Sequence, residues 1–93
     1  MNHFCTITTY DHLYKVLALR DSLLHYDDNT LLHVLMTDGS PASVQQAHIK
    51  MYAVADIDSE PIVKKIAAKY HNQPDRLRWS LKPPYLKYLL NEV

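Results

Sequence analysis

The chain has 93 residues and a mass of 10.8 kDa, which suits one small domain and excludes two. Ten basic and ten acidic residues give a formal net charge of zero, so the composition has no electrostatic footprint for nucleic acid or an acidic membrane surface. The only cysteine, Cys5, excludes an internal disulfide and fits a reducing compartment. The only glycine, Gly39, excludes every glycine-rich phosphate loop. The opening residues lack the pattern of a secretory signal, and no run approaches the roughly 18 apolar residues of a membrane span, so we expect a cytoplasmic protein.

The first part of the chain alternates strand and helix patterns. Residues 3–9 are rich in β-branched and aromatic types, which predicts a strand. From Leu13 the apolar residues follow the three- and four-residue spacing of an amphipathic helix, with Asp11 as its expected N-cap and a polar loop at 27–29 as its end. Residues 31–37 form a nearly continuous apolar run, which is typical of a parallel strand covered on both faces.

The second part continues the alternation. Ser40 and Pro41 predict the start of a short helix that runs through about Lys50. A short strand is expected over 51–55, and a helix over 62–70 follows a loop. In the last segment, 77–93, the pair Pro83-Pro84 predicts that one helix ends and another begins.

This order of elements predicts an α/β domain over residues 1–93, in a Rossmann-like three-layer αβα arrangement with a small, mostly parallel sheet. Three strands offer little area for helices on both faces. The sequence also stops on an apolar helix, Tyr85–Leu90, where an α/β chain would continue into a strand. We therefore expect that these residues form the first half of a larger domain, or that two copies associate to complete one.

Several segments together resemble a known family in their order and spacing. They are Phe4–Thr9, Val16–Leu23, Leu32–Asp38, Arg78–Pro83 and Tyr85–Leu90. Across nearly the whole chain they resemble the N-terminal half of a GT-A glycosyltransferase, a nucleotide-diphospho-sugar transferase similar to the family 8 group. The resemblance implies a Rossmann-like nucleotide-binding fold and a nucleotide sugar, expected to be a UDP-sugar, as ligand. It also implies transfer of the sugar from a nucleoside diphosphate to an acceptor hydroxyl.

The resemblance points to a binding edge, because ligands of such folds lie beyond the carboxyl ends of parallel strands. Thr8, Thr9, Tyr10 and Asp38 occupy that edge, and their hydroxyls and carboxylate suit a uracil edge or ribose, with Tyr10 able to stack on a base. Lys82 resembles the family position that faces the donor's phosphates. Each residue also has a simpler interpretation: threonines favour strand ends, Asp38 favours a turn, and Lys82 can be a solvated charge. No catalytic base or nucleophile is identified.

The family's metal-binding Asp-x-Asp follows the strand after the helix represented by Tyr85–Leu90. Because the sequence ends before that strand, we expect no transferase activity from this chain alone, and the Mn²⁺ or Mg²⁺ ion of the complete family enzyme is not expected here. Asp56 and Asp58 have the same spacing but precede the Trp-Ser-Leu-Lys-Pro segment. Their carboxylates could chelate Mg²⁺ or Mn²⁺. We favour the simpler interpretation, a solvated loop in which Asp58 caps the helix that follows.

The remaining candidates favour structural roles. The six histidines lack the spacing of a zinc site, and His33 is expected to be a hydrogen-bonded core residue. Cys5 is expected to be a small buried hydrophobe. The alternative function is a non-catalytic interaction module that binds a second copy or another partner through the Tyr85–Leu90 helix.

Overall fold

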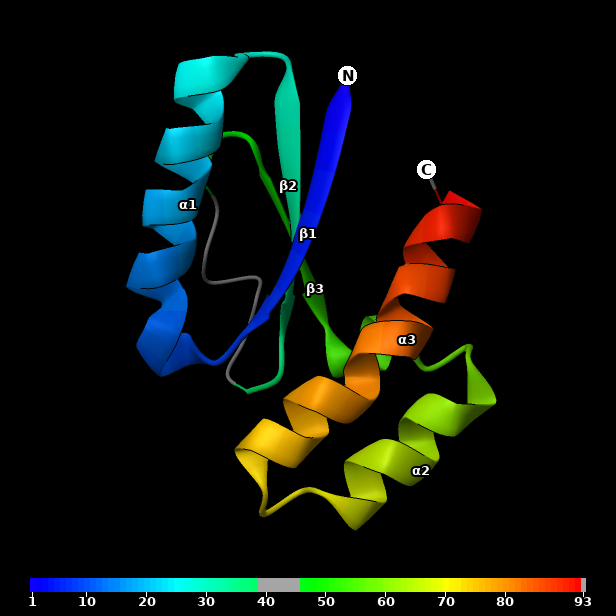
Figure 1. Cartoon of the computed structure of the whole chain (residues 1–93). Coiled ribbons are helices and arrows are strands. Elements are labelled where there is room, and N and C mark those ends of the chain that lie inside the picture. Colours follow the sequence, from blue (N-terminus) through cyan, green and yellow to red (C-terminus); the bar gives the residue numbers. More distant parts are fainter. Residues whose placement is uncertain (39–45, 93) are drawn as a thin grey trace.

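A computed structural model describes residues 1–38 and 46–92 of the chain. Three strands, β1 (Asn2–Thr8), β2 (Thr30–Met36) and β3 (Ile49–Ala53), form a sheet in the order β1-β2-β3 (Figure 1). Both strand pairs are parallel. The predicted α/β class and the predicted parallel sheet of three strands are confirmed.

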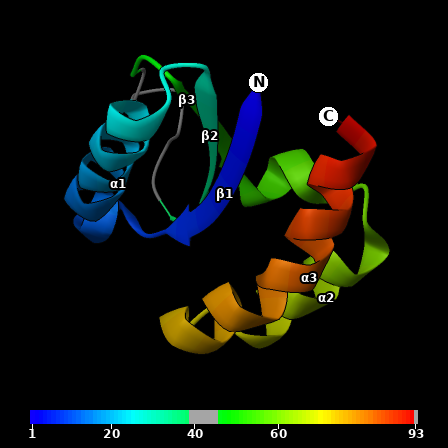
Figure 2. The same ribbon diagram turned by 45° about the horizontal axis from the view of Figure 1, so that its top comes forward.

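The helices lie on both faces of the sheet. They are η1 (Tyr10–His12), α1 (Leu13–Tyr26), η3 (Val54–Ile57), α2 (Pro61–Lys69) and α3 (Pro74–Glu92). Figure 2 shows α1 on one side of the sheet and the pair α2 and α3 on the other. The described elements therefore form the helix–sheet–helix layers predicted from the sequence.

Alternate side chains of β2 fill two separate cores. On the α1 side, Leu32 and Val34 are fully buried against Val16. On the opposite side, Leu35 belongs to a larger core contributed by β3, η3, α2 and α3. The members of this larger core are Leu35, Tyr52, Ile57, Val63, Leu81, Tyr85 and Leu89. Because both faces of β2 are covered, its sequence has no polar–apolar alternation.

The second predicted helix does not reach Lys50. Its first residues, 41–45, lie outside the described part of the chain, but Ala47 and His48 form a turn and Ile49 begins β3. The His48 carbonyl accepts the Leu32 N–H at 2.9 Å, so pairing with β2 starts there. His48 has a φ of 63°, a left-handed conformation that costs a non-glycine residue about 1–2 kcal/mol. The hydrogen bond to β2, formed directly at this turn, outweighs helix propensity over these residues.

The predicted break at Pro83-Pro84 is also wrong, because α3 continues through both prolines. Two prolines remove two N–H donors from the helix, which leaves the carbonyls of Trp79 and Ser80 without their usual partners. Leu81 and Tyr85, on either side of the pair, are buried in the larger core. Their burial offsets the lost hydrogen bonds, and the helix bends in its middle instead of ending (Figure 2).

Two of the helix caps predicted from the sequence are not formed by the expected residues. Asp11 lies inside η1, and the N-cap position of α1 is His12, whose N–H is donated to the Thr9 carbonyl at 3.2 Å. Asp58 does not cap α2. The N-cap position of α2 is Glu60, which makes no side-chain capping hydrogen bond, and Pro61 is the first residue of the helix. Instead, the Asp56 carboxylate accepts the Ala53 N–H at 2.7 Å at the start of η3.

Within residues 1–38 and 46–92, none of the helices combines the length and the apolar character that crossing a bilayer requires.

Candidate functional site

The carboxyl ends of β1 and β2 lie next to each other. Thr8 pairs with Met36 in the parallel register, and the Thr37 N–H donates to the Thr8 carbonyl at 3.0 Å. Beyond the strands, the Tyr10 N–H donates to the Asp38 carboxylate at 2.7 Å. The early threonines and the later aspartate, which the sequence predicts to converge, therefore meet at one edge of the sheet.

The predicted residues differ in how accessible they are there. Thr8 is buried, and its hydroxyl donates to the Thr9 carbonyl at 2.8 Å, so it holds the turn after β1. Thr9 is half-buried, whereas Tyr10 is 56% exposed and Asp38 is exposed. Thr9, Tyr10 and Asp38 are thus the members of this group that a ligand can reach.

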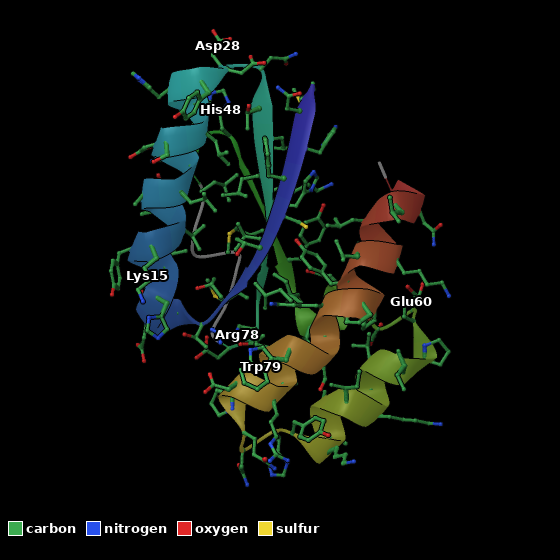
Figure 3. All side chains as sticks on the ribbon, viewed as in Figure 1. Lys15, Asp28, His48, Glu60, Arg78 and Trp79 are labelled. Atoms are coloured by element: carbon green, nitrogen blue, oxygen red, sulfur yellow. The ribbon has the colours of Figure 1, made fainter. Side chains whose placement is uncertain are left out.

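A pocket of about 250 Å³ adjoins the end of β1 on the α1 side. We name it the α1-side pocket, and its lining residues are Thr6, Ile7, Thr8, Thr9, His12, Lys15, Val16, Leu19 and Arg78. Lys15 lies in the first turn of α1, and Arg78 reaches the pocket from α3 (Figure 3). The lining contains Lys15 and Arg78 and no carboxylate, so the pocket suits an anionic group.

A second pocket of about 360 Å³ lies along the other side of β1. We name it the α3-side pocket, and its lining residues are Cys5, Thr6, Ile7, Arg78, Lys82, Tyr85 and Leu86. Lys82 therefore faces β1 from α3 and not the Thr8-to-Asp38 edge. Arg78 lines both pockets. It shares the α1-side pocket with Lys15 and the α3-side pocket with Lys82.

The cations of the two pockets are weakly neutralised by the described side chains. Arg78 has one ion pair, to Asp75 on the same helix, at 3.5 Å. No ion pair among the described residues includes Lys15 or Lys82. An exposed pair of this kind is worth about 0–1 kcal/mol, so it leaves Arg78 available to a ligand.

Sequence reasoning identified Lys82 but missed Arg78 and Lys15. Arg78 precedes Lys82 by four residues and so shares its helix face, which is a signal the sequence does carry. Lys15 lies in the first turn of the helix that follows β1, where a side chain can return to the strand end. What the sequence does not give is the approach of α3 to β1, because no local pattern fixes how the two elements pack.

A buried hydroxyl and an exposed thiol belong to the lining of the α3-side pocket. The Tyr85 hydroxyl is buried and has no hydrogen-bond partner among the described residues. Burial first, and then Cys5 and Tyr52, raise the pKa of Tyr85 above its ordinary range, so the hydroxyl stays protonated. Cys5 is exposed, contrary to the predicted burial, because β1 is an edge strand with one uncovered side.

His33 is the hydrogen-bonded core residue expected from the sequence. It is 1% exposed, and its two ring nitrogens lie 2.9 Å from His3 Nδ1 and 2.9 Å from the Tyr52 hydroxyl. Burial lowers the pKa of His33, and the neighbouring His3 and Lys50 lower it further. The ring therefore serves the core as a neutral group.

The described residues contain no group of three potential metal-ligating side chains. Asp56 and Asp58 flank the buried Ile57, and the Asp56 carboxylate is already used by the Ala53 N–H. The two carboxylates alone do not make up a group of three potential ligands, and nothing in the proposed function depends on a metal ion held by them.

Comparison with known proteins gives no assignment, since no protein-family model, curated protein or solved structure matches the chain significantly.

Proposed function

We propose that this chain binds a nucleoside-diphosphate sugar, with a UDP-sugar as the expected donor, and acts as the donor-binding portion of a GT-A glycosyltransferase. In the whole enzyme the glycosyl group would pass from the diphosphate to an acceptor hydroxyl. The diphosphate lies near Arg78, between Lys15 of one pocket and Lys82 of the other. The nucleoside lies toward Thr9, Tyr10 and Asp38.

The observation that supports this proposal is a pair of basic side chains, Lys15 and Arg78, beside the carboxyl end of a parallel strand, with one weak ion pair, to Asp75, among the described residues. Parallel α/β sheets bind their ligands at such ends. Lys15 and Arg78 line the α1-side pocket, and Arg78 and Lys82 line the α3-side pocket, with no carboxylate in either lining. A diphosphate carries the charge and the acceptor oxygens that these donors need.

The neighbouring edge suits the nucleoside part of the same ligand. Tyr10 is exposed enough to stack on a base, and the Thr9 hydroxyl can hydrogen-bond a ribose. Asp38 fixes the loop through the Tyr10 N–H with one carboxylate oxygen, which leaves the other oxygen for a ligand hydroxyl. The resemblance of the sequence to GT-A enzymes favours a nucleotide sugar over other diphosphates.

Titration of the isotope-labelled chain with UDP, followed by amide NMR, tests the proposal. We expect saturable shifts at Thr9, Tyr10 and Arg78. Arg78→Ala should weaken UDP binding about tenfold, because a charge-assisted hydrogen bond to phosphate contributes roughly 1.5–3 kcal/mol. Uridine, which lacks the diphosphate, should bind more weakly than UDP to the unaltered chain and about equally to both chains.

Arg76→Ala is the matched control, because Arg76 is exposed on the same helix and lines neither pocket. It should leave the UDP affinity unchanged. Shifts that do not saturate by roughly 10 mM UDP, or equal losses in the two arginine variants, would rule out the proposed site.

A further inference from the structure

The zero net charge of the chain conceals an uneven distribution of charge along the sequence. Residues 1–60 carry three basic and eight acidic side chains, whereas residues 61–93 carry seven basic and two acidic ones. The formal net charges of the two parts are therefore −5 and +5. The basic part is the one that forms α2 and α3, the helix pair on one side of the sheet (Figure 2). An asymmetry of this size points to an anionic partner for that helix layer.

The outer face of α2 carries three of these basic side chains. Within Pro61–Lys69, Val63 is fully buried and Ile66 and Ala67 are half-buried, so these three residues mark the inner side of the helix. Because successive residues are about 100° apart around a helix, the other six residues lie toward the opposite side, and all six are exposed. We name them the α2 outer face: Pro61, Ile62, Lys64, Lys65, Ala68 and Lys69.

The lysines of the α2 outer face form no ion pair within the described part of the chain. Every ion pair found there joins other residues, and residues 61–74 contain no acidic side chain. The Nζ of Lys69 lies 5.3 Å from the centre of the Tyr70 ring, which is an aromatic contact and not an ionic one. Three cations therefore share one exposed helix face without neutralisation by the described side chains, which leaves them available to an anionic partner.

The α2 outer face is separate from the proposed nucleotide site. Its lysines line neither the α1-side pocket nor the α3-side pocket. Figures 1 and 2 both show α3 between α2 and β1, so a further strand beside β1 would not cover this face. The exposed side of a single helix is convex, whereas a small ligand is held in a concave site, so the shape of the face suits an extended surface. A partner of this face therefore binds independently of a nucleotide.

The composition of the face favours a lipid surface over other anionic partners. Single-stranded nucleic acid is held by aromatic side chains on which its bases stack, and the α2 outer face has no aromatic residue. Carboxylates of a protein partner are matched in fixed geometry by arginine, whereas lysine is a point charge on a flexible stem. Anionic headgroups are spread over a plane and need no fixed geometry. Ile62, at the margin of the face and 49% exposed, adds an apolar group that fits the headgroup layer.

We propose that the α2 outer face docks on the surface of a membrane that contains anionic phospholipids. Lys64, Lys65 and Lys69 pair with the headgroups, and Ile62 enters the headgroup layer. The helix lies on the membrane and does not enter its hydrocarbon region, because Val63 is held in the larger core of the domain. Each lysine strengthens such docking about fivefold, so the chain binds weakly, reversibly and in a salt-dependent way.

Flotation of the full chain with lipid vesicles tests the proposal. The probes are vesicles of phosphatidylcholine with about 30% phosphatidylserine, and vesicles of phosphatidylcholine alone. We expect binding to the first and none to the second. Raising the salt concentration from about 0.1 to 1 M shortens the screening length from roughly 10 to 3 Å and should release the bound chain. Absence of binding to the anionic vesicles, or equal binding to both kinds, overturns the proposal.

Variants of the lysines locate the binding surface. Lys64→Gln, Lys65→Gln and Lys69→Gln should each weaken vesicle binding about fivefold. Replacing all three lysines by arginine keeps the charge and should keep the binding. Lys15→Gln is the matched control, because α1 lies at the other side of the sheet (Figure 2), and it should leave vesicle binding unchanged. An equal loss in Lys15→Gln would contradict the proposal, because overall charge and not this face would then attract the chain.

Two further measurements separate a membrane from other anionic partners. Ile62→Ser should weaken binding to the anionic vesicles, and an unchanged affinity contradicts the place of Ile62 in the headgroup layer. Single-stranded poly(U), at the same phosphate concentration as the vesicles, should not displace the chain from them. Displacement overturns the proposal in favour of a nucleic acid. UDP should not release the chain from the vesicles either, and failure of the UDP titration leaves the vesicle result unaffected.

Discussion

At the scale of single residues, His33 is the most deeply buried of the polar residues in the described part of the chain, at 1% exposed. It lies in the central strand between His3 and the Tyr52 hydroxyl, with each ring nitrogen 2.9 Å from a neighbour. A hydrogen bond between two imidazole nitrogens requires one of them to be unprotonated. Burial, and then the nearby His3 and Lys50, disfavour the charged form of His33 and lower its pKa, so the folded chain holds the ring neutral.

The lowered pKa of His33 predicts how stability depends on pH. The folded chain binds a proton at His33 less readily than the unfolded chain, whose histidines have a pKa near 6.5. The stabilisation is therefore complete above pH 6.5 and is lost as the pH falls below it. Urea unfolding at pH 7.5 and pH 5.5 should show a clear loss of unfolding free energy at the lower pH.

Substitution separates His33 from the other histidines. His33→Gln, which keeps hydrogen-bonding groups but cannot take up a proton in this range, should be less stable at pH 7.5 and should decline less between the two values. His25→Ala, at an exposed position of α1, should decline as much as the unaltered chain. An equal decline in all three chains would contradict the assignment to His33.

At the scale of elements, the sequence predicts the strands and α1 well because their patterns arise from burial. The apolar run of β2 and the spacing of Val16 and Leu23 reflect the faces that these residues cover. The start of β3, the course of α3 and the exposure of Cys5 could not be predicted. The start of β3 depends on the turn at His48, and the course of α3 depends on packing around its prolines. The exposure of Cys5 depends on which strand forms the edge of the sheet. Each is decided by contacts between residues far apart in the sequence.

The same distinction applies to the candidate site. The order of elements predicts that Thr9 and Asp38 meet, since consecutive parallel strands end at the same edge. It does not predict that Arg78 reaches both pockets, because no local pattern fixes how α3 crosses β1. The sequence thus predicted which strand-end residues lie together, and from α3 it singled out only Lys82.

The prolines of α3 give a prediction for that element. Pro83 is exposed inside the helix, whereas Pro84 is buried. Pro83→Ala restores an N–H that can bond to the Trp79 carbonyl and removes a ring that crowds the preceding turn. A proline inside a helix costs roughly 3 kcal/mol relative to alanine, and after relaxation of the bend we expect a gain of about 1–2 kcal/mol. Urea unfolding of the variant and of the unaltered chain measures this gain in the free energy of unfolding.

Pro84→Ala is the paired variant, and it also restores a donor but removes a buried ring. Its gain should be smaller than that of Pro83→Ala, because the cavity offsets part of the hydrogen bond. If both variants lose stability, the bend itself is required for α3 to cover the sheet.

At the scale of the whole molecule, β2 links the two layers. Leu32 and Val34 belong to the α1 core, while Leu35, the next residue along, belongs to the α3 core. Neither layer can separate from the sheet without exposing one face of this strand. Since small domains unfold in a single cooperative step, damage to one core should lower the stability of both.

Leu81→Ala tests this coupling from the α3 side. Leu81 is fully buried, and truncation of such a leucine costs about 2–5 kcal/mol, a large share of the roughly 5–15 kcal/mol expected for a whole domain. The urea midpoint should fall by the same amount whether it is read from Trp79 fluorescence on α3 or from hydrogen exchange at Val34 under α1. Leu90→Ala, at a position 79% exposed, should change the free energy of unfolding obtained from either measurement by less than about 0.5 kcal/mol. If the Val34 amide kept its protection while the fluorescence midpoint fell, α3 would unfold independently and the two layers would not form one cooperative unit.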